Sequence, residues 1–113
     1  MTIGPEGQSL QELDFGYAMV ELYEKIGKQT GYWANYFLRS VRKHGGVEAA
    51  RRLLHADKLD SKPSKGFMSL LRMSRLDLTL EREILWPRWD GLFTEQERDF
   101  CRRRLAEYGY RSE

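Results

Sequence analysis

The sequence predicts an all-α fold, a compact single-domain bundle of five to six helices. Apolar residues recur at spacings of three and four in several segments, and no segment of useful length alternates in the manner of a strand. Hydroxyl residues precede several of these segments at the spacing of helix caps. The 113 residues match the size of one domain, and 41% of them are apolar, which suffices for a core.

The first helix is predicted to follow a short tail. Residues 1–8 contain glycine and proline without periodicity and predict a flexible tail, so that residues 9–113 form the domain. Ser9 and Glu12 have the spacing of a capping box, and Asp14 offers a second possible start. Gly16 weakens the early part of this helix. The helix could end at Gly27, but Gly31 is the better stop. One face of the helix carries Phe15, Met19, Leu22 and Ile26.

A pair of glycines separates the next two predicted helices. The second helix is expected over Tyr32–His44, with Arg39, Arg42 and Lys43 pointing away from its apolar side. Gly45-Gly46 ends it. The third helix, Val47–Leu54, is short and places its arginines outside.

The second half of the chain is predicted to turn at a polar elbow. Ser64 can cap a fourth helix that begins near Gly66, and the helical pattern breaks at Arg75–Thr79. Thr79 can cap a fifth helix, which Pro87 ends.

The last helix has the clearest start. Thr94 and Glu97 form a capping box, and Gly109 suits the end. Its expected inward residues are Phe100, Cys101, Leu105 and Tyr108, and its expected outward residues are Arg98, Arg102 and Arg103.

Composition predicts a cytoplasmic protein. A single cysteine, Cys101, excludes a disulfide within the chain and fits a reducing compartment. No apolar run approaches the ~20 residues that span a membrane. The N-terminal residues show neither the basic nor the apolar region of a secretion signal.

No residues form a convincing catalytic, cofactor or metal site. His44 and His55 have no metal-ligand spacing, and Cys101 fits a buried thiol on the apolar side of its helix. Asp77, Glu81 and Glu83 could form a carboxylate cluster for hydrolysis, but they also suit the start of a helix. No glycine-rich phosphate loop is present. We therefore predict a non-enzymatic protein with no cofactor and no metal, and keep a carboxylate-dependent hydrolase as the less favoured alternative.

The centre of the chain is basic. Residues 39–75 contain ten basic and three acidic residues, a net charge of +7, between acidic flanks, whereas the whole chain carries only +2. We predict a small adaptor that docks on a larger bacterial protein or nucleic-acid machine through this basic central face. The same charges would also suit a merely solvated surface. The candidate face comprises Arg39, Arg42, Lys43, Arg51, Arg52, Lys58, Lys62, Lys65, Arg72 and Arg75.

An alternative is DNA or RNA binding through residues 47–75, in the manner of a helix-turn-helix. Val47–Leu54 would be the supporting helix and Ser64–Ser74 the inserted helix. The connection of about ten residues exceeds the typical ~3–4, and the inserted helix is rather apolar. A protein partner is therefore favoured over direct contact with nucleic acid, and no membrane partner is expected.

Several short motifs occur in a particular order over residues 17–110. They are Gly45-Gly46-Val-Glu-Ala-Ala-Arg-Arg-Leu-Leu54, Gly66-Phe67 with Leu70, Arg75-Leu76-Asp77-Leu78-Thr79 with Glu81, Leu92-Phe93-Thr94 with Glu97, and Arg104-Leu105 with Tyr108-Gly109-Tyr110. This series resembles a widespread family of short uncharacterised bacterial helical proteins and modules. The resemblance implies that the glycine pair and the elbow are structural, and it carries over no catalytic residue. The segment between Leu54 and Gly66 is long and lysine-rich for that family.

Overall fold

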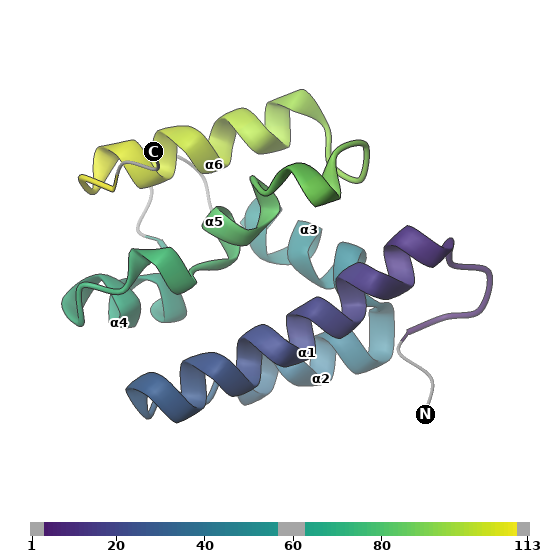
Figure 1. The fold of residues 1–113 in the computed structure, drawn as a ribbon, viewed down its shortest axis with the longest axis horizontal. Helices are drawn as coiled ribbons and strands as arrows, with labels where there is room; N and C mark the ends of the chain where they lie inside the picture. The colour runs from purple at the N-terminus through teal and green to yellow at the C-terminus, as the bar shows by residue number, and fades with distance from the viewer. Residues whose placement is uncertain (1–3, 57–62, 111–113) are drawn as a thin grey trace. The chain divides into compact units, whose positions relative to one another are not determined.

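The structure, a computed structural model, describes residues 4–56 and 63–110. Within those residues it has six α-helices, two short 3-10 helices and no strand (Figure 1). The predicted all-α class and the predicted number of helices are confirmed. The helices fall into two compact units, Met1–Ala56 and Asp57–Glu113. Each unit is described by itself below, and the predicted division into a tail over 1–8 and one domain over 9–113 stays a prediction.

The N-terminal unit contains α1 (Leu10–Thr30), α2 (Asn35–His44) and α3 (Gly46–Ala56), which pack on one another. The Ser9 hydroxyl accepts from the Glu12 N–H at 3.1 Å, and the Glu12 carboxylate accepts from the Ser9 N–H at 2.8 Å. This capping box selects the earlier of the two possible starts. α1 ends at Gly31, which has φ of 80°, as predicted. α2 begins three residues later than predicted.

Two glycines let the helices of the N-terminal unit approach closely. A Cβ atom on Gly46 would lie 2.6 Å from the Gly16 Cα, so α1 and α3 cross backbone to backbone at this pair. A Cβ atom on Gly27 would lie 2.2 Å from the Trp33 ring, which covers that glycine. Larger residues would therefore not fit at Gly46 or Gly27, and Gly16 is the backbone that α3 approaches in α1.

The segment before α1 is joined to the α2–α3 junction. The Gly4 N–H donates to the Arg42 carbonyl at 3.1 Å. A Cβ atom on Gly4 would lie only 2.4 Å from the Gly45 Cα. Residues 4–8, which we call the N-terminal arm, thus contact α2 at its last turn.

The C-terminal unit consists of five short elements. They are α4 (Lys65–Arg72), the 3-10 helix η1 (Leu76–Leu78), α5 (Leu80–Ile84), the 3-10 helix η2 (Pro87–Trp89) and α6 (Glu95–Glu107). All three predicted caps form: Ser64, Thr79 and Thr94 each accept from the N–H three residues later, at 3.2, 3.2 and 3.0 Å. The predicted elbow is the 3-10 turn between α4 and α5.

α4 and α6 end in the same hydrogen-bonded motif. After α6, the Gly109 N–H donates to the Ala106 carbonyl and the Tyr110 N–H to the Leu105 carbonyl. After α4, the Ser74 N–H donates to the Leu71 carbonyl and the Arg75 N–H to the Leu70 carbonyl. This is the Schellman arrangement, whose turning residue has positive φ. Gly109 has φ of 86° and Ser74 has φ of 58°.

The C-terminal unit buries charged residues as well as apolar ones. Phe67, Leu76 and Leu105 form a core cluster, against which Tyr108 packs. The buried polar or charged residues of the described chain, Thr79, Glu81, Glu97 and Arg104, all belong to this unit.

The expected outward position of Arg98 is wrong. Only 15% of its side chain is exposed, and its guanidinium donates to the carbonyls of Ile84 and Leu85 at 3.0 and 3.4 Å. Arg98 points inward because these last carbonyls of α5 lack helical partners. Arg102 and Arg103 are exposed, as predicted.

None of the described helices has both the length and the hydropathy that a membrane span requires.

Candidate functional site

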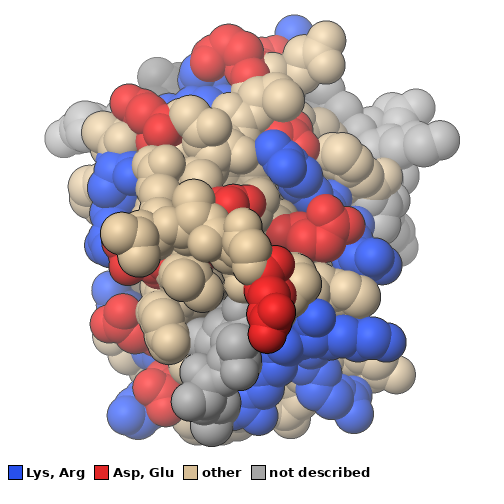
Figure 2. All heavy atoms as spheres, turned by 90° about the vertical axis from the view of Figure 1, so that its right-hand side faces the viewer, with Lys and Arg blue, Asp and Glu red and all other residues tan. Residues whose placement is uncertain are grey.

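Three exposed basic side chains of the N-terminal unit lie together on α2. Tyr36, Arg39, Arg42 and Lys43 are exposed, and at 3.6 residues per turn they occupy about one third of the helix circumference. We call these four residues the α2 face. Tyr36 is 84% exposed, and the Arg39 guanidinium lies 4.5 Å from the centre of its ring. Figure 2 shows Lys and Arg side chains gathered at its lower right, on the side of the molecule where α2 ends.

The cations of the α2 face have no carboxylate partner within the described residues. No ion pair there links Arg39, Arg42 or Lys43 to an acidic side chain. On α3, by contrast, Arg52 forms a 3.1 Å ion pair with Glu48. The α2 face is therefore positive and is not neutralised locally.

An aromatic contact fixes the start of α2. Trp33 covers Gly27 of α1 and packs at a tilt against Tyr23, with 5.4 Å between the ring centres. The Tyr23 hydroxyl donates to the Asn35 side chain in the first turn of α2. Trp33 is nevertheless 44% exposed, so an accessible indole lies in the connection that precedes the α2 face.

The five residues of the predicted basic face that follow α3 do not belong to the described N-terminal unit. Lys58 and Lys62 lie outside the described residues. Lys65, Arg72 and Arg75 belong to the C-terminal unit, where Lys65 and Arg72 are exposed.

Arg75 has an acidic partner within the C-terminal unit. It forms an ion pair with Asp77 at 3.1 Å, and this hydrogen bond raises the pKa of Arg75. A single basic face across both units stays a prediction. What the structure brings together is the part on α2, with Arg51 of α3 on the same pocket as Lys43.

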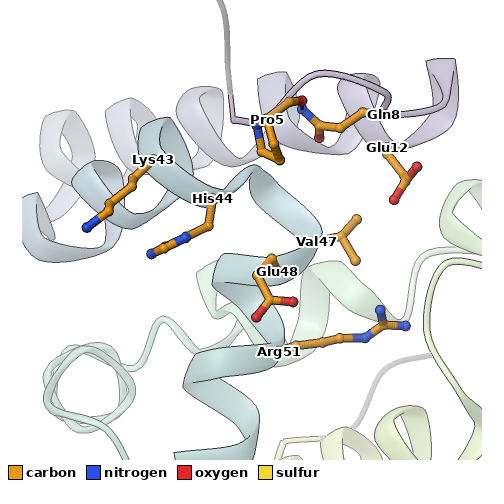
Figure 3. A pocket seen from close by; sticks show the side chains of 8 residues that line it. All are labelled: Pro5, Gln8, Glu12, Lys43, His44, Val47, Glu48 and Arg51. Carbon is orange, nitrogen blue, oxygen red and sulfur yellow. Dashed lines mark hydrogen bonds between the residues drawn. The ribbon is translucent and has the colours of Figure 1, made fainter.

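That pocket lies where the N-terminal arm, α1, α2 and α3 meet (Figure 3). Its volume is about 340 Å³. Charged side chains come from the start of α1, the end of α2 and the start of α3. The lining residues are Pro5, Gln8, Glu12, Lys43, His44, Val47, Glu48 and Arg51.

The predicted helix-turn-helix remains a prediction, because its two helices belong to different units. Within the C-terminal unit, α4 uses Phe67 and Leu70 for the core. The apolar character of this helix is thus explained by burial.

The three carboxylates considered for hydrolysis have separate surroundings. Asp77 pairs with Arg75, Glu81 is buried, and Glu83 accepts from the Trp89 indole N–H at 2.7 Å. Across the described residues, no three His, Cys, Asp or Glu side chains are grouped as metal ligands.

Cys101 is buried, as predicted. Burial raises the pKa of its thiol, and the nearby negative charges of Glu81 and Glu97 raise it further. A thiol in this environment stays protonated and is a poor nucleophile.

Helical spacing could have identified two residues that sequence reasoning misplaced or omitted. Tyr36 is absent from the face predicted from the sequence, yet it lies on the charged face of α2, three residues before Arg39. Arg104 shares the inward face of α6 with Cys101, three residues earlier, and is fully buried.

Searches of protein-family models, of curated proteins and of solved structures found no match to this chain.

Proposed function

We propose that this protein is a non-enzymatic interaction module that binds an acidic surface of a larger protein through the α2 face. The observation that carries the proposal is the exposed Tyr36–Arg39 pair, followed by Arg42 and Lys43, with no carboxylate partner in the described chain. Arg39, Arg42 and Lys43 are the residues of the predicted basic face that lie exposed together on α2.

The availability of these charges is what favours binding. A cation that already has a carboxylate partner must give up that partner to bind another, whereas Arg39 and Arg42 would gain one. Tyrosine and arginine are also enriched among the residues that dominate the energy of protein interfaces. A rigid helix presents them with little loss of entropy on binding.

The test reverses two charges on the α2 face. Arg39→Glu/Arg42→Glu is compared with wild type and with Arg102→Glu/Arg103→Glu, a control that reverses two exposed arginines of α6 which already pair with Glu95 and Asp99. The full-length proteins are used to capture partners from a bacterial lysate, and the affinity for the dominant protein partner is then measured. We expect the α2 variant to bind at least about tenfold more weakly, which is a loss of about 1.4 kcal/mol in binding free energy. The α6 variant should bind as tightly as wild type.

Equal losses of affinity in the two variants would show that only net charge matters and would overturn the proposal.

A second experiment titrates the protein with duplex DNA at low and moderate salt. Tight DNA binding that falls steeply as salt rises, with no protein partner, would favour direct nucleic-acid binding instead.

A further inference from the structure

The pocket at the α2–α3 junction shares Lys43 with the α2 face, and its other lining residues lie outside that face. In Figure 3, Lys43 and His44 lie on one side, at the end of α2, and Glu12 lies on the other. Gln8 and Pro5 come from the N-terminal arm, which Gly4 joins to α2 by its hydrogen bond to the Arg42 carbonyl. The pocket is thus built from separate segments whose relative positions are fixed by backbone contacts.

The two acidic side chains of the pocket are already engaged. Glu12 accepts from the Ser9 N–H in the capping box, and Glu48 accepts from Arg52 at 3.1 Å. Neither Ser9 nor Arg52 lines the pocket. Lys43, in contrast, has no acidic partner in the described chain. The side of the pocket near Lys43 and His44 is therefore the one that would favour a negative group.

We propose that this pocket binds a small oxyanion, a phosphate or carboxylate group on a compact molecule. The anion would be held by the Lys43 ammonium and by His44, which lie near each other in Figure 3. A volume of about 340 Å³ suits a small molecule, since ligand pockets begin at about 300 Å³. Lys43 is common to the pocket and the α2 face, whereas Tyr36, Arg39 and Arg42 do not line the pocket, so the two sites can be tested separately.

The test follows the backbone amide signals of the full-length, ¹⁵N-labelled protein during titration with inorganic phosphate or with succinate. Sodium chloride at equal ionic strength is the reference. We expect one of the two anions to cause saturable shifts at Lys43, His44, Val47 and Glu48, and the one that does so identifies the oxyanion class. Lys43→Gln should weaken that binding about tenfold, as expected for loss of a charge-assisted hydrogen bond. Lys28→Gln, an exposed lysine of α1 outside the pocket, should leave it unchanged.

The proposal is overturned if neither anion gives saturable shifts, if sodium chloride reproduces them, or if the two lysine variants bind equally. Arg39→Gln separates this result from the proposed function, because Arg39 does not line the pocket and a neutral side chain there adds no carboxylate near Lys43. That variant should lose affinity for the protein partner and keep its affinity for the anion. Loss of both affinities in Arg39→Gln, with the helix content retained, would count against a separate anion site.

Discussion

Arg42 lies exposed at the end of α2, whereas Arg98 in the first turns of α6 has only 15% of its side chain exposed. Arg42 has no acidic partner in the described residues. Arg98 donates to two backbone carbonyls and lies 3.5 Å from Asp90. Arg42 is thus an exposed surface charge, whereas Arg98 is a structural residue that hydrogen-bonds to the backbone of its own unit.

This difference extends to the way each unit is held together. The N-terminal unit packs α1 against α3 at two glycines, and its buried residues are apolar or glycine. The C-terminal unit buries Glu81, Glu97 and Arg104. The C-terminal unit thus buries charged side chains, whereas the charged side chains of the N-terminal unit lie outside its buried core, where they can bind a partner. This is why we locate both candidate sites in the N-terminal unit.

The largest effect is expected where the N-terminal unit relies on close packing. Gly46→Ala would place a methyl group 2.6 Å from the Gly16 Cα, and this neighbour is backbone that cannot rotate away. We expect a loss of about 3 kcal/mol in the free energy of unfolding, measured by urea denaturation. The control is Gly31→Ala, where no atom lies within 4 Å and only the positive φ opposes a side chain. That change should cost about 1 kcal/mol. Similar losses in the two variants would show that the α1–α3 crossing tolerates a side chain.

The next largest effect is a difference in stability between alanine substitutions at Arg98 and at Arg42. Arg98→Ala removes the guanidinium that donates to the partly buried carbonyls of Ile84 and Leu85. We expect about 2 kcal/mol of destabilisation from this change. Arg42→Ala should change stability by less than about 0.5 kcal/mol, because the side chain is exposed and has no ion pair in the described chain. Thermal unfolding of both variants checks this, and an equally large effect of Arg42→Ala would remove the distinction between surface and structural arginines.

The sequence predicted the local features of the fold better than its close contacts. The caps at Ser9, Ser64, Thr79 and Thr94 depend on residues three positions apart, and all four form. The close approach at Gly46 depends on a residue thirty positions earlier, which no local pattern reports.

The candidate site shows the same limit. The positions of Arg39, Arg42 and Lys43 on the outside of a helix follow from periodicity. Whether each cation has an acidic partner depends on where other segments lie. The spacing of three residues places Tyr36 near Arg39, but the 4.5 Å contact between its ring and the guanidinium is seen only in the structure.

The smallest expected effect is a gain in stability at the end of α4. Ser74 has φ of 58° and is the only non-glycine residue of the described chain with positive φ. At the equivalent position after α6, the same hydrogen-bond pattern uses Gly109. Ser74→Gly should therefore raise the free energy of unfolding by about 0.5–1 kcal/mol, because the strain of the left-handed conformation outweighs the greater flexibility of glycine in the unfolded chain. Gly109→Ser should lower it by a similar amount, and urea denaturation of both variants measures the pair. If Ser74→Gly destabilises the protein, the side chain of Ser74 contributes more at this turn than its backbone strain costs.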